Sequence, residues 1–323
     1  MKQLSCVYTA GCCRDKTGAT KACYWVNGLL NDLHPAEASW SYVCALVISD
    51  GRVYAAGAYS SGGGAKACYW VDGEKKDLSN GDNPGGIASS EALAIAIADG
   101  KVYAAGAYSS GGSAKACYWV DGERKDLSNE ADNSEVRAIA VSDGKVYAAG
   151  TYSDDSGAVR ACYWVDGKKT DLPKDSEVNV FAIADGKVYA AGHYSSAGNA
   201  ADNTDSSYKA CYWVDGERTE LPNPAGVSPG HTSTGVGAIT VSEGKVYVAG
   251  YYYDGENKAC YWVDGKHYDL RGNFSTHAIA VSGGKVYVAG FGAGKACYWV
   301  DGERTELPGG IRGSKALTLA VDA

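Results

Sequence analysis

The amino-acid sequence predicts an all-β fold, a seven-bladed β-propeller built of four-stranded antiparallel blades. The first observation is a repeat, because the pentapeptide Cys-Tyr-Trp-Val-Asp occurs seven times, with Asn in place of Asp in the first copy. Its cysteines are Cys23, Cys68, Cys117, Cys162, Cys211, Cys260 and Cys297. The copies are 37 to 49 residues apart, and a spacing near 45 is typical of a propeller blade. The second observation is composition, since 43 Gly, 24 Tyr and 8 Trp suit tight turns and buried strands.

One full unit, residues 134–173, shows why each copy forms four strands. Two Asp-Gly pairs, Asp143-Gly144 and Asp166-Gly167, indicate two-residue hairpin turns. The four segments that they help to delimit, called strands A to D, are 136–142, 145–152, 160–165 and 168–172. Strands A, B and C carry apolar residues on both faces, as expected for a sheet packed between two others. Strand D is polar and suits an outer edge.

The two ends of the chain are the third observation, because they complete one blade between them. Residues 4–11 match strand B, whereas residues 316–322 match strand A with no B, C or D after them. We therefore expect the C-terminal strand 316–322 to pair with the N-terminal strands in the first blade and close the ring. The chain, 1–323, is then a single propeller domain. The predicted blades are 314–323 with 1–35, 41–80, 90–129, 134–173, 176–222, 234–271 and 274–308.

Charge and hydropathy exclude two classes of partner. A net charge of −8 and no cluster of Lys and Arg argue against nucleic acid. The longest apolar run, 92–98, is far shorter than the roughly 20 residues of a membrane-spanning helix. We expect a monomer without a membrane span. We also expect it to be exported or associated with the cell envelope of a bacterium, with a cytoplasmic location as the alternative.

Cysteine and histidine positions argue against metal sites and cofactors. Seven of the eleven cysteines are one position repeated, too far apart for disulfides between blades, so we expect buried thiols there. The cysteines outside the pattern, which can pair, are Cys6, Cys12, Cys13 and Cys44. The five histidines occupy unrelated places in the repeat, and no pair has zinc spacing. The sequence also has no nucleophile elbow, P-loop or dinucleotide fingerprint, so we expect no metal, no cofactor and no catalytic residue.

The connections between strands predict which face binds. The A-B and C-D turns are short and nearly uniform, whereas the B-C and D-A loops vary in length and chemistry. In an up-and-down blade these two sets lie on opposite faces of the disc. Variable loops on a rigid scaffold usually carry binding residues, so we expect the ligand on the B-C and D-A face.

Two positions of strand A break the uniformity of the repeat at that face. The residue six before the A-B turn is in turn Cys44, Leu93, Arg137, Asn179, Gly237, His277 and Leu317, and two residues earlier lie Tyr42, Glu91, Glu135, Glu177, Gly235, Ser275 and Lys315. If strand A is innermost, both series line the mouth of a central channel. The predicted ligand-binding residues are Tyr42, Glu91, Glu135, Arg137, Glu177, Asn179, His277 and Lys315. The three glutamates either hold a cationic group or are solvated.

A tyrosine series at the end of strand B gives a second candidate surface. Its members are Tyr59, Tyr108, Tyr152, Tyr194 and Tyr252, and Cys13 and Gly292 interrupt it. The rings either stack against a ligand or pack between blades, and we favour packing because the position repeats.

The repeat resembles one family. The segments Gly-Lys-Val-Tyr-Val-Ala-Gly at 244–250, Lys-Ala-Cys-Tyr-Trp at 258–262 and Asp269-Leu270 resemble the repeat of poorly characterised bacterial propeller proteins, which are often exported. The resemblance covers nearly the whole chain and implies the fold, but it brings no catalytic residues. The repeat differs from WD40 repeats, because Val follows Trp, and from kelch repeats, because no Gly-Gly pair precedes the aromatic strand.

These observations lead to one expected function and two alternatives. We expect a non-enzymatic scaffold that binds a protein or a glycan on the variable face. The first alternative is a polysaccharide hydrolase or lyase with its active site at the channel mouth. The second is a structural module of a larger assembly.

Overall fold

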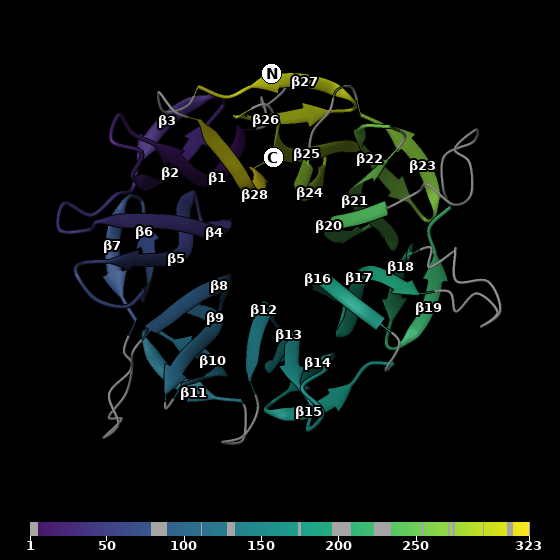
Figure 1. Cartoon of the computed structure of the whole chain (residues 1–323), viewed down its shortest axis with the longest axis horizontal. Helices are drawn as coiled ribbons and strands as arrows, with labels where there is room; N and C mark the ends of the chain where they lie inside the picture. Colours follow the sequence, from purple (N-terminus) through teal and green to yellow (C-terminus); the bar gives the residue numbers. More distant parts are fainter. Residues whose placement is uncertain are drawn as a thin grey trace.

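A computed structural model describes residues 6–78, 89–110, 112–127, 133–173, 176–195, 208–222, 234–253, 255–270, 272, 275–292, 294–308 and 313–322, with the side chains of 110, 176, 177, 195 and 208 left out. These residues form seven four-stranded antiparallel sheets arranged as a ring around a central channel (Figure 1). The predicted seven-bladed β-propeller is therefore confirmed. Strand A of every blade lies innermost and strand D lies at the outer rim.

The strand bounds follow the repeat closely. Blade 1 contains β28 (Ser314–Asp322), β1 (Cys6–Arg14), β2 (Thr20–Val26) and β3 (Leu29–Asp32). Blade 2 contains β4 (Trp40–Ser49), β5 (Arg52–Ser60), β6 (Lys66–Val71) and β7 (Glu74–Asp77), and blade 3 contains β8 (Ser89–Ala98), β9 (Lys101–Ser110), β10 (Ser113–Val120) and β11 (Glu123–Asp126). Blade 4 contains β12 (Ser134–Ser142), β13 (Lys145–Ser153), β14 (Val159–Val165) and β15 (Lys168–Asp171), and blade 5 contains β16 (Ser176–Ala184), β17 (Lys187–Ser195), β18 (Tyr208–Val214) and β19 (Glu217–Glu220). Blade 6 contains β20 (Thr234–Ser242), β21 (Lys245–Tyr253), β22 (Asn257–Val263) and β23 (Lys266–Asp269), and blade 7 contains β24 (Ser275–Ser282), β25 (Lys285–Gly292), β26 (Lys295–Val300) and β27 (Glu303–Glu306).

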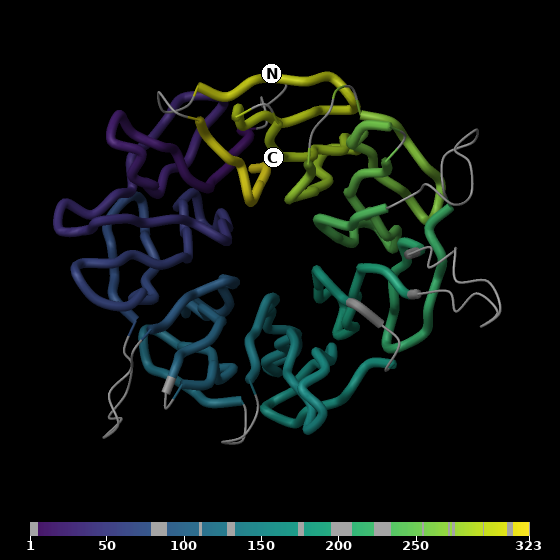
Figure 2. Tube along the Cα trace, in the orientation of Figure 1, coloured from purple at the N-terminus to yellow at the C-terminus, as the bar shows by residue number. Residues whose placement is uncertain are grey.

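The C-terminal strand closes the ring. β28 pairs antiparallel with β1, in a register that places Cys6 opposite Asp322 and Val7 opposite Val321. Figure 2 shows this meeting of the two ends of the chain, yellow against purple. The predicted closing strand 316–322 is thus confirmed, and it begins two residues earlier, at Ser314. The N-terminal strand predicted at 4–11 is β1, and residues 1–5 lie outside the described part of the chain.

The short turns have the backbone that their sequences require. Asp143 and Gly144 both have positive φ, 50° and 70°, and Asp166 and Gly167 have 47° and 81°. Positive φ at both central residues is the signature of a type I′ hairpin turn, which is why Asp-Gly recurs there. The C-D turn also bonds to strand B, since Asp166 Oδ1 accepts a hydrogen bond from Val146 N at 2.9 Å and Asp166 N donates to Val146 O at 2.9 Å.

The core lies between blades, and the repeated tryptophan dominates it. The seven tryptophans of the repeat are at most 1% exposed. Trp25 of blade 1 packs with Leu307 and Tyr287 of blade 7, and the other blades follow the same pattern. Its indole Nε1 donates to Pro308 O at 2.6 Å, across the closing interface. The repeated cysteines are equally buried, and all eleven cysteines of the chain are thiols in this structure.

A row of buried hydroxyls links neighbouring blades at the start of strand A. Ser134 Oγ of blade 4 accepts a hydrogen bond from Ala116 N of blade 3 at 3.0 Å. The equivalent bond across the closing interface runs from Ala296 N of blade 7 to Ser314 Oγ of blade 1, at 3.1 Å. Ser41, Ser90 and Thr234 make the same bond in other blades. The ring therefore closes with the same polar contact that joins four other pairs of neighbouring blades.

Candidate functional site

A β-bulge in every blade creates the channel-lining residues. The pairing of strand A with strand B skips one residue of strand A in each blade, for example Arg137 between Val136 and Ala138. The skipped residues are Cys44, Leu93, Arg137, Asn179, Gly237, His277 and Leu317, the first variable series of the sequence. A bulge re-aims the extra side chain, and all seven residues line one central cavity of about 370 Å³.

A glycine of strand B makes the bulge possible. A Cβ atom added to Gly150 would overlap Glu135 O far inside van der Waals contact. Gly57, Gly106 and Gly290 face the same carbonyl in their own blades. The Ala-Gly pair that recurs in strand B is therefore explained by this close approach of two backbones, rather than by a turn.

The carboxylates at the mouth of the channel divide into three cases. Glu135 Oε1 accepts a hydrogen bond from Arg137 Nε at 2.7 Å and forms an ion pair with Nη2 at 2.5 Å, so these two residues neutralise each other. Arg137 Nη1 also donates to Asn179 O of blade 5 at 3.3 Å. Glu91 lies beside Tyr42, where burial and the neighbouring Cys44 and Glu91 raise the pKa of the Tyr42 phenol.

Glu177 is the third case, because its side chain lies outside the described part of the structure. Its backbone belongs to β16 and pairs with His193. Among the residues whose side chains are described, no group of three or more His, Cys, Asp and Glu is placed to hold a metal ion.

The tyrosine series is part of the scaffold. Tyr59, Tyr108, Tyr194 and Tyr252 are at most 6% exposed. A cation from strand D of the same blade lies over the ring in four cases, as Lys169 Nζ does at 3.5 Å from the centroid of Tyr152. Such cation–π contacts stabilise the blade edge, and the packing interpretation of the series is favoured over a stacking surface.

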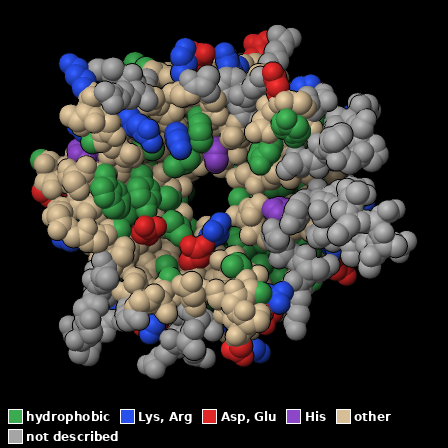
Figure 3. Space-filling view, in the orientation of Figure 1, with side chains coloured by type: hydrophobic (Ala, Val, Ile, Leu, Met, Phe, Trp, Pro, Cys, Tyr) green, Lys and Arg blue, Asp and Glu red, His purple; other side chains and the backbone are tan. Residues whose placement is uncertain are grey.

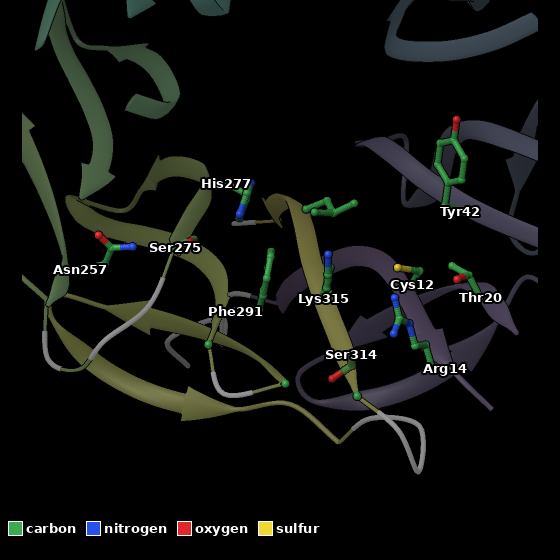
Figure 4. A pocket seen from close by; sticks show the side chains of 14 residues that line it. Cys12, Arg14, Thr20, Tyr42, Asn257, Ser275, His277, Phe291, Ser314 and Lys315 are labelled. Atoms are coloured by element: carbon green, nitrogen blue, oxygen red, sulfur yellow. The ribbon is translucent and has the colours of Figure 1, made fainter. Parts of the chain in front are cut away.

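A pocket lies where this series is interrupted. It has a volume of about 570 Å³ and lies at the boundary of blades 7 and 1, with Gly292 in its wall where other blades have tyrosine (Figure 4). The connection from β25 to β26 has two residues, as short as the one from β9 to β10. Blade 7 combines this short connection with the missing ring, and the pocket lies there.

An aromatic pair forms one wall of this pocket. The rings of Phe291 and His277 stack with centroids 4.9 Å apart and planes 9° apart, and Lys315 Nζ lies 4.7 Å from the Phe291 centroid. Burial, followed by the nearby Lys315, lowers the pKa of His277. The Nε2 atom of His277 is buried and has no hydrogen-bond partner among the described residues.

Two cations of blade 1, Arg14 and Lys315, also line this pocket. In the register of β1 with β28 and β2, Cys12 pairs with Lys315 and Arg14 pairs with Thr20. Paired residues and residues two apart share a face of a sheet, so all four side chains project to the same side (Figure 4). None of the described lining residues is Asp or Glu, which makes this pocket basic in a chain of net charge −8.

The pocket contains three of the eight predicted ligand-binding residues. Tyr42, His277 and Lys315 line the pocket, and His277 also lines the central cavity with Arg137 and Asn179. Figure 3 shows this face of the ring, with basic, acidic and hydrophobic side chains and histidines close to the central opening. Glu91 and Glu135 are not among the described residues that line either space.

Sequence reasoning missed Arg14 and Phe291. A usable signal for Phe291 was present, because the residue before the tyrosine position varies as widely as the strand A series. Its members are Cys12, Ala58, Ala107, Thr151, His193, Tyr251 and Phe291. Each pairs with the second variable position of strand A, as Phe291 does with Ser275.

Comparisons with known proteins support the fold but do not indicate a function. No protein-family model matches the chain, and no curated protein matches it. Among solved structures, the β-propeller domain of the Trilobed protease from Pyrococcus furiosus is 14% identical, with 95% of each chain covered and a TM-score of 0.54. A puromycin-hydrolyzing peptidase of Mycobacterium tuberculosis is 12% identical with a TM-score of 0.54, over 90% of this chain.

These likenesses show the fold alone, because both identities are low. The chain spans about half the length of the mycobacterial peptidase, 49%. The described residues also contain no helix with the length and hydrophobicity that crossing a bilayer requires. The chain is thus a seven-bladed β-propeller whose most distinctive described surface is the pocket between blades 7 and 1.

Proposed function

We propose that the protein is a non-enzymatic binding scaffold that holds a glycan in the pocket between blades 7 and 1. The observation that supports this proposal is the pocket itself, about 570 Å³ in volume, with Phe291 and Tyr42 in its wall among hydroxyl and amide groups. Ligand sites of small molecules commonly have volumes of 300–1,000 Å³. Aromatic rings beside polar groups suit the apolar face and the hydroxyls of a sugar ring.

The chemistry of the pocket favours binding over glycoside hydrolysis. Hydrolysis of this kind usually needs two carboxyl groups that flank the scissile bond, and none of the described lining residues is acidic. Glu135, a carboxylate at the mouth of the channel, is paired with Arg137. A polysaccharide lyase or hydrolase is therefore the alternative, and an assay for turnover of polysaccharide tests it.

The recessed shape favours a glycan over a protein partner. A protein interface is usually a broad surface of about 800 Å² per partner, whereas this pocket is a concave site lined mainly by blades 7 and 1, together with Tyr42 of blade 2 and Asn257 of blade 6. A location at the bacterial cell envelope would give such a scaffold access to polysaccharide. Fractionation of the source cells tests that location.

The test is saccharide binding to the wild-type protein and to Phe291→Ala. We expect binding to at least one saccharide of an array covering neutral and acidic glycans, and at least about tenfold weaker binding by Phe291→Ala. Tyr251→Ala is the matched control, because Tyr251 occupies the equivalent position of blade 6 and is not among the described pocket residues. Thermal unfolding of each variant shows whether it is folded.

Two outcomes would contradict the proposal. The first is no binding to any saccharide of the array by a folded wild-type protein. The second is cleavage of a bound polysaccharide, detected as new reducing ends or as ultraviolet absorbance of an unsaturated product, which would replace the scaffold with the enzyme alternative.

A further inference from the structure

We propose that the glycan bound in this pocket is acidic, and that Arg14 and Lys315 hold its carboxylate or sulfate group. This inference rests on the proposed function and adds the chemical class of the ligand. The two side chains project from the neighbouring strands β1 and β28 to the same side of the sheet (Figure 4).

The first argument is that these two cations lack an acidic partner. Among the described residues, no carboxylate forms an ion pair with Arg14 or Lys315. Several other cations of this chain do have one, as Lys21 does in Asp15 at 3.3 Å and Lys75 does in Glu37 at 3.0 Å. The chain has 38 acidic and 30 basic residues, so a pocket whose described lining holds two cations and no carboxylate differs from its overall composition.

The second argument is the geometry of recognition. The guanidinium of Arg14 offers a planar fork of donors that matches the oxygens of a carboxylate or a sulfate. Lys315 adds a compact positive charge beside it, and its ammonium already lies near the Phe291 ring. A sugar ring that lies against Phe291 therefore places a charged ring substituent within reach of the Lys315 ammonium.

The third argument is the surrounding polarity. The described lining also includes Thr20, Asn257 and Ser275, which supply neutral donors and acceptors for hydroxyl groups. Because the protein as a whole is negatively charged, general electrostatic attraction opposes an anionic ligand. Binding of such a ligand would have to come from local contacts of this kind.

The experiment measures binding of three polymers by titration calorimetry at low salt. Polygalacturonate tests the carboxylate, dextran sulfate tests the sulfate, and dextran is the neutral reference. Arg14→Gln and Lys315→Gln remove one charge each, and Lys145→Gln is the matched control because Lys145 is exposed at the start of β13, beside the A-B turn on the opposite face.

We expect at least one acidic polymer to bind and dextran not to bind. Arg14→Gln and Lys315→Gln should each weaken that binding by about tenfold or more, whereas Lys145→Gln should change it less than twofold. Added sodium chloride should weaken binding by the wild type. The polymer that binds identifies the anionic group.

The failures of the two proposals are distinguishable. Equal binding of dextran and the acidic polymers, unaffected by Arg14→Gln and Lys315→Gln, would overturn the acidic ligand and leave the glycan scaffold standing. The acidic ligand would also be overturned if Lys145→Gln weakened binding of an acidic polymer as much as Arg14→Gln does. An absence of binding to every saccharide would overturn both.

A second observation, independent of the pocket, concerns Cys13 and Cys23. Their Sγ atoms lie 2.9 Å apart, between the adjacent strands β1 and β2, and both side chains are buried. Cys13 stands where five other blades have tyrosine, so this contact is specific to blade 1. We infer that these two thiols form a disulfide when the chain folds in the presence of a small-molecule disulfide.

The reaction is a thiol–disulfide exchange. The two thiols lose two protons and two electrons and form one S–S bond, while the S–S bond of oxidised glutathione breaks and gives two glutathione thiols. Because both sulfur atoms are buried, we expect the exchange during refolding rather than in the folded protein.

Thiol counting after refolding tests the disulfide. Refolding with oxidised glutathione, followed by denaturation and alkylation, should leave nine of the eleven cysteines alkylated, and mass spectrometry should find the Cys13–Cys23 linked peptide. Cys13→Ser should remove the linked peptide, and Cys12→Ser, the matched control, should keep it. Eleven alkylated cysteines in the refolded wild type, or a linkage that persists in Cys13→Ser, would overturn the inference.

Discussion

His277 lines both the central channel and the pocket, as Leu317 does. It is the bulged residue of blade 7, so it has no partner residue in the pairing of β24 with β25. The imidazole stacks on Phe291 and lies near the ammonium of Lys315. Burial and this positive charge both disfavour the imidazolium, which lowers the pKa of His277.

This lowered pKa predicts a pH dependence of stability. In the unfolded chain His277 titrates near the ordinary value of about 6.5, and in the folded protein it takes up a proton only at lower pH. The unfolded state therefore binds more protons as the pH falls below about 6.5, and the melting temperature should fall with it. Burial also lowers the pKa of His34 and His267, which add to the effect.

Differential scanning calorimetry between pH 7.5 and pH 5 measures this dependence. His277→Gln should have a shallower decline of the melting temperature than the wild type, because glutamine has no proton to gain. A decline of equal slope in both proteins would show that His277 takes no part in it.

At the scale of the element, one glycine and one bulge recur together. Gly150 allows Glu135 O to approach strand B closely, and this approach accompanies the bulge that turns Arg137 into the channel. In each of the seven blades a glycine of strand B lies opposite the strand A residue that precedes the bulge. A glycine of strand B thus accompanies the bulge that positions the variable residue of the neighbouring strand A.

Gly150→Ala should destabilise the protein, because the new Cβ would overlap the backbone of β12. Overpacking of this kind typically costs about 1–3 kcal/mol and occasionally more. Gly63→Ala is the matched control, since a Cβ at Gly63 meets nothing within 4 Å, and it should stay within about 0.5 kcal/mol of the wild type. Urea unfolding followed by tryptophan fluorescence measures both, and equal stability of the two variants would contradict the explanation of the bulge.

At the scale of the whole molecule, the ring depends on contacts between its two ends. β28 supplies strand A of blade 1, the Ala296 N to Ser314 Oγ bond joins blades 7 and 1, and Trp25 reaches Pro308 O across the same boundary. The pocket lies at this boundary as well. Ring closure and the proposed binding therefore depend on the same interface.

Removal of residues 316–323 should open the ring. Blade 1 would lose its inner strand and expose the edge of β1, which favours aggregation. We expect loss of cooperative thermal unfolding, and partial recovery when a peptide of residues 313–323 is added, because the peptide can pair with β1. A truncated protein that unfolds cooperatively at the wild-type temperature would contradict this account of closure.

Much of the fold could be predicted because its signals are local. Asp143-Gly144 specifies a hairpin turn through backbone φ alone, and the alternating apolar residues of strands A to C specify a buried sheet. The buried tryptophans follow from their repetition. The bulge was not predicted, because Gly150 is unusual only for what its missing Cβ would touch in another strand.

The candidate site was predicted only in part for the same reason. Tyr42, His277 and Lys315 were found because they vary within strand A, whereas Arg14 lies outside both variable series of that strand. By itself the sequence determined the seven blades, their short turns and the joining of the two ends, since these depend on local backbone preferences and on a repeated apolar pattern. Only the tertiary structure decided that Arg14, Phe291 and Lys315 share one pocket, because ring closure brings together side chains from opposite ends of the chain.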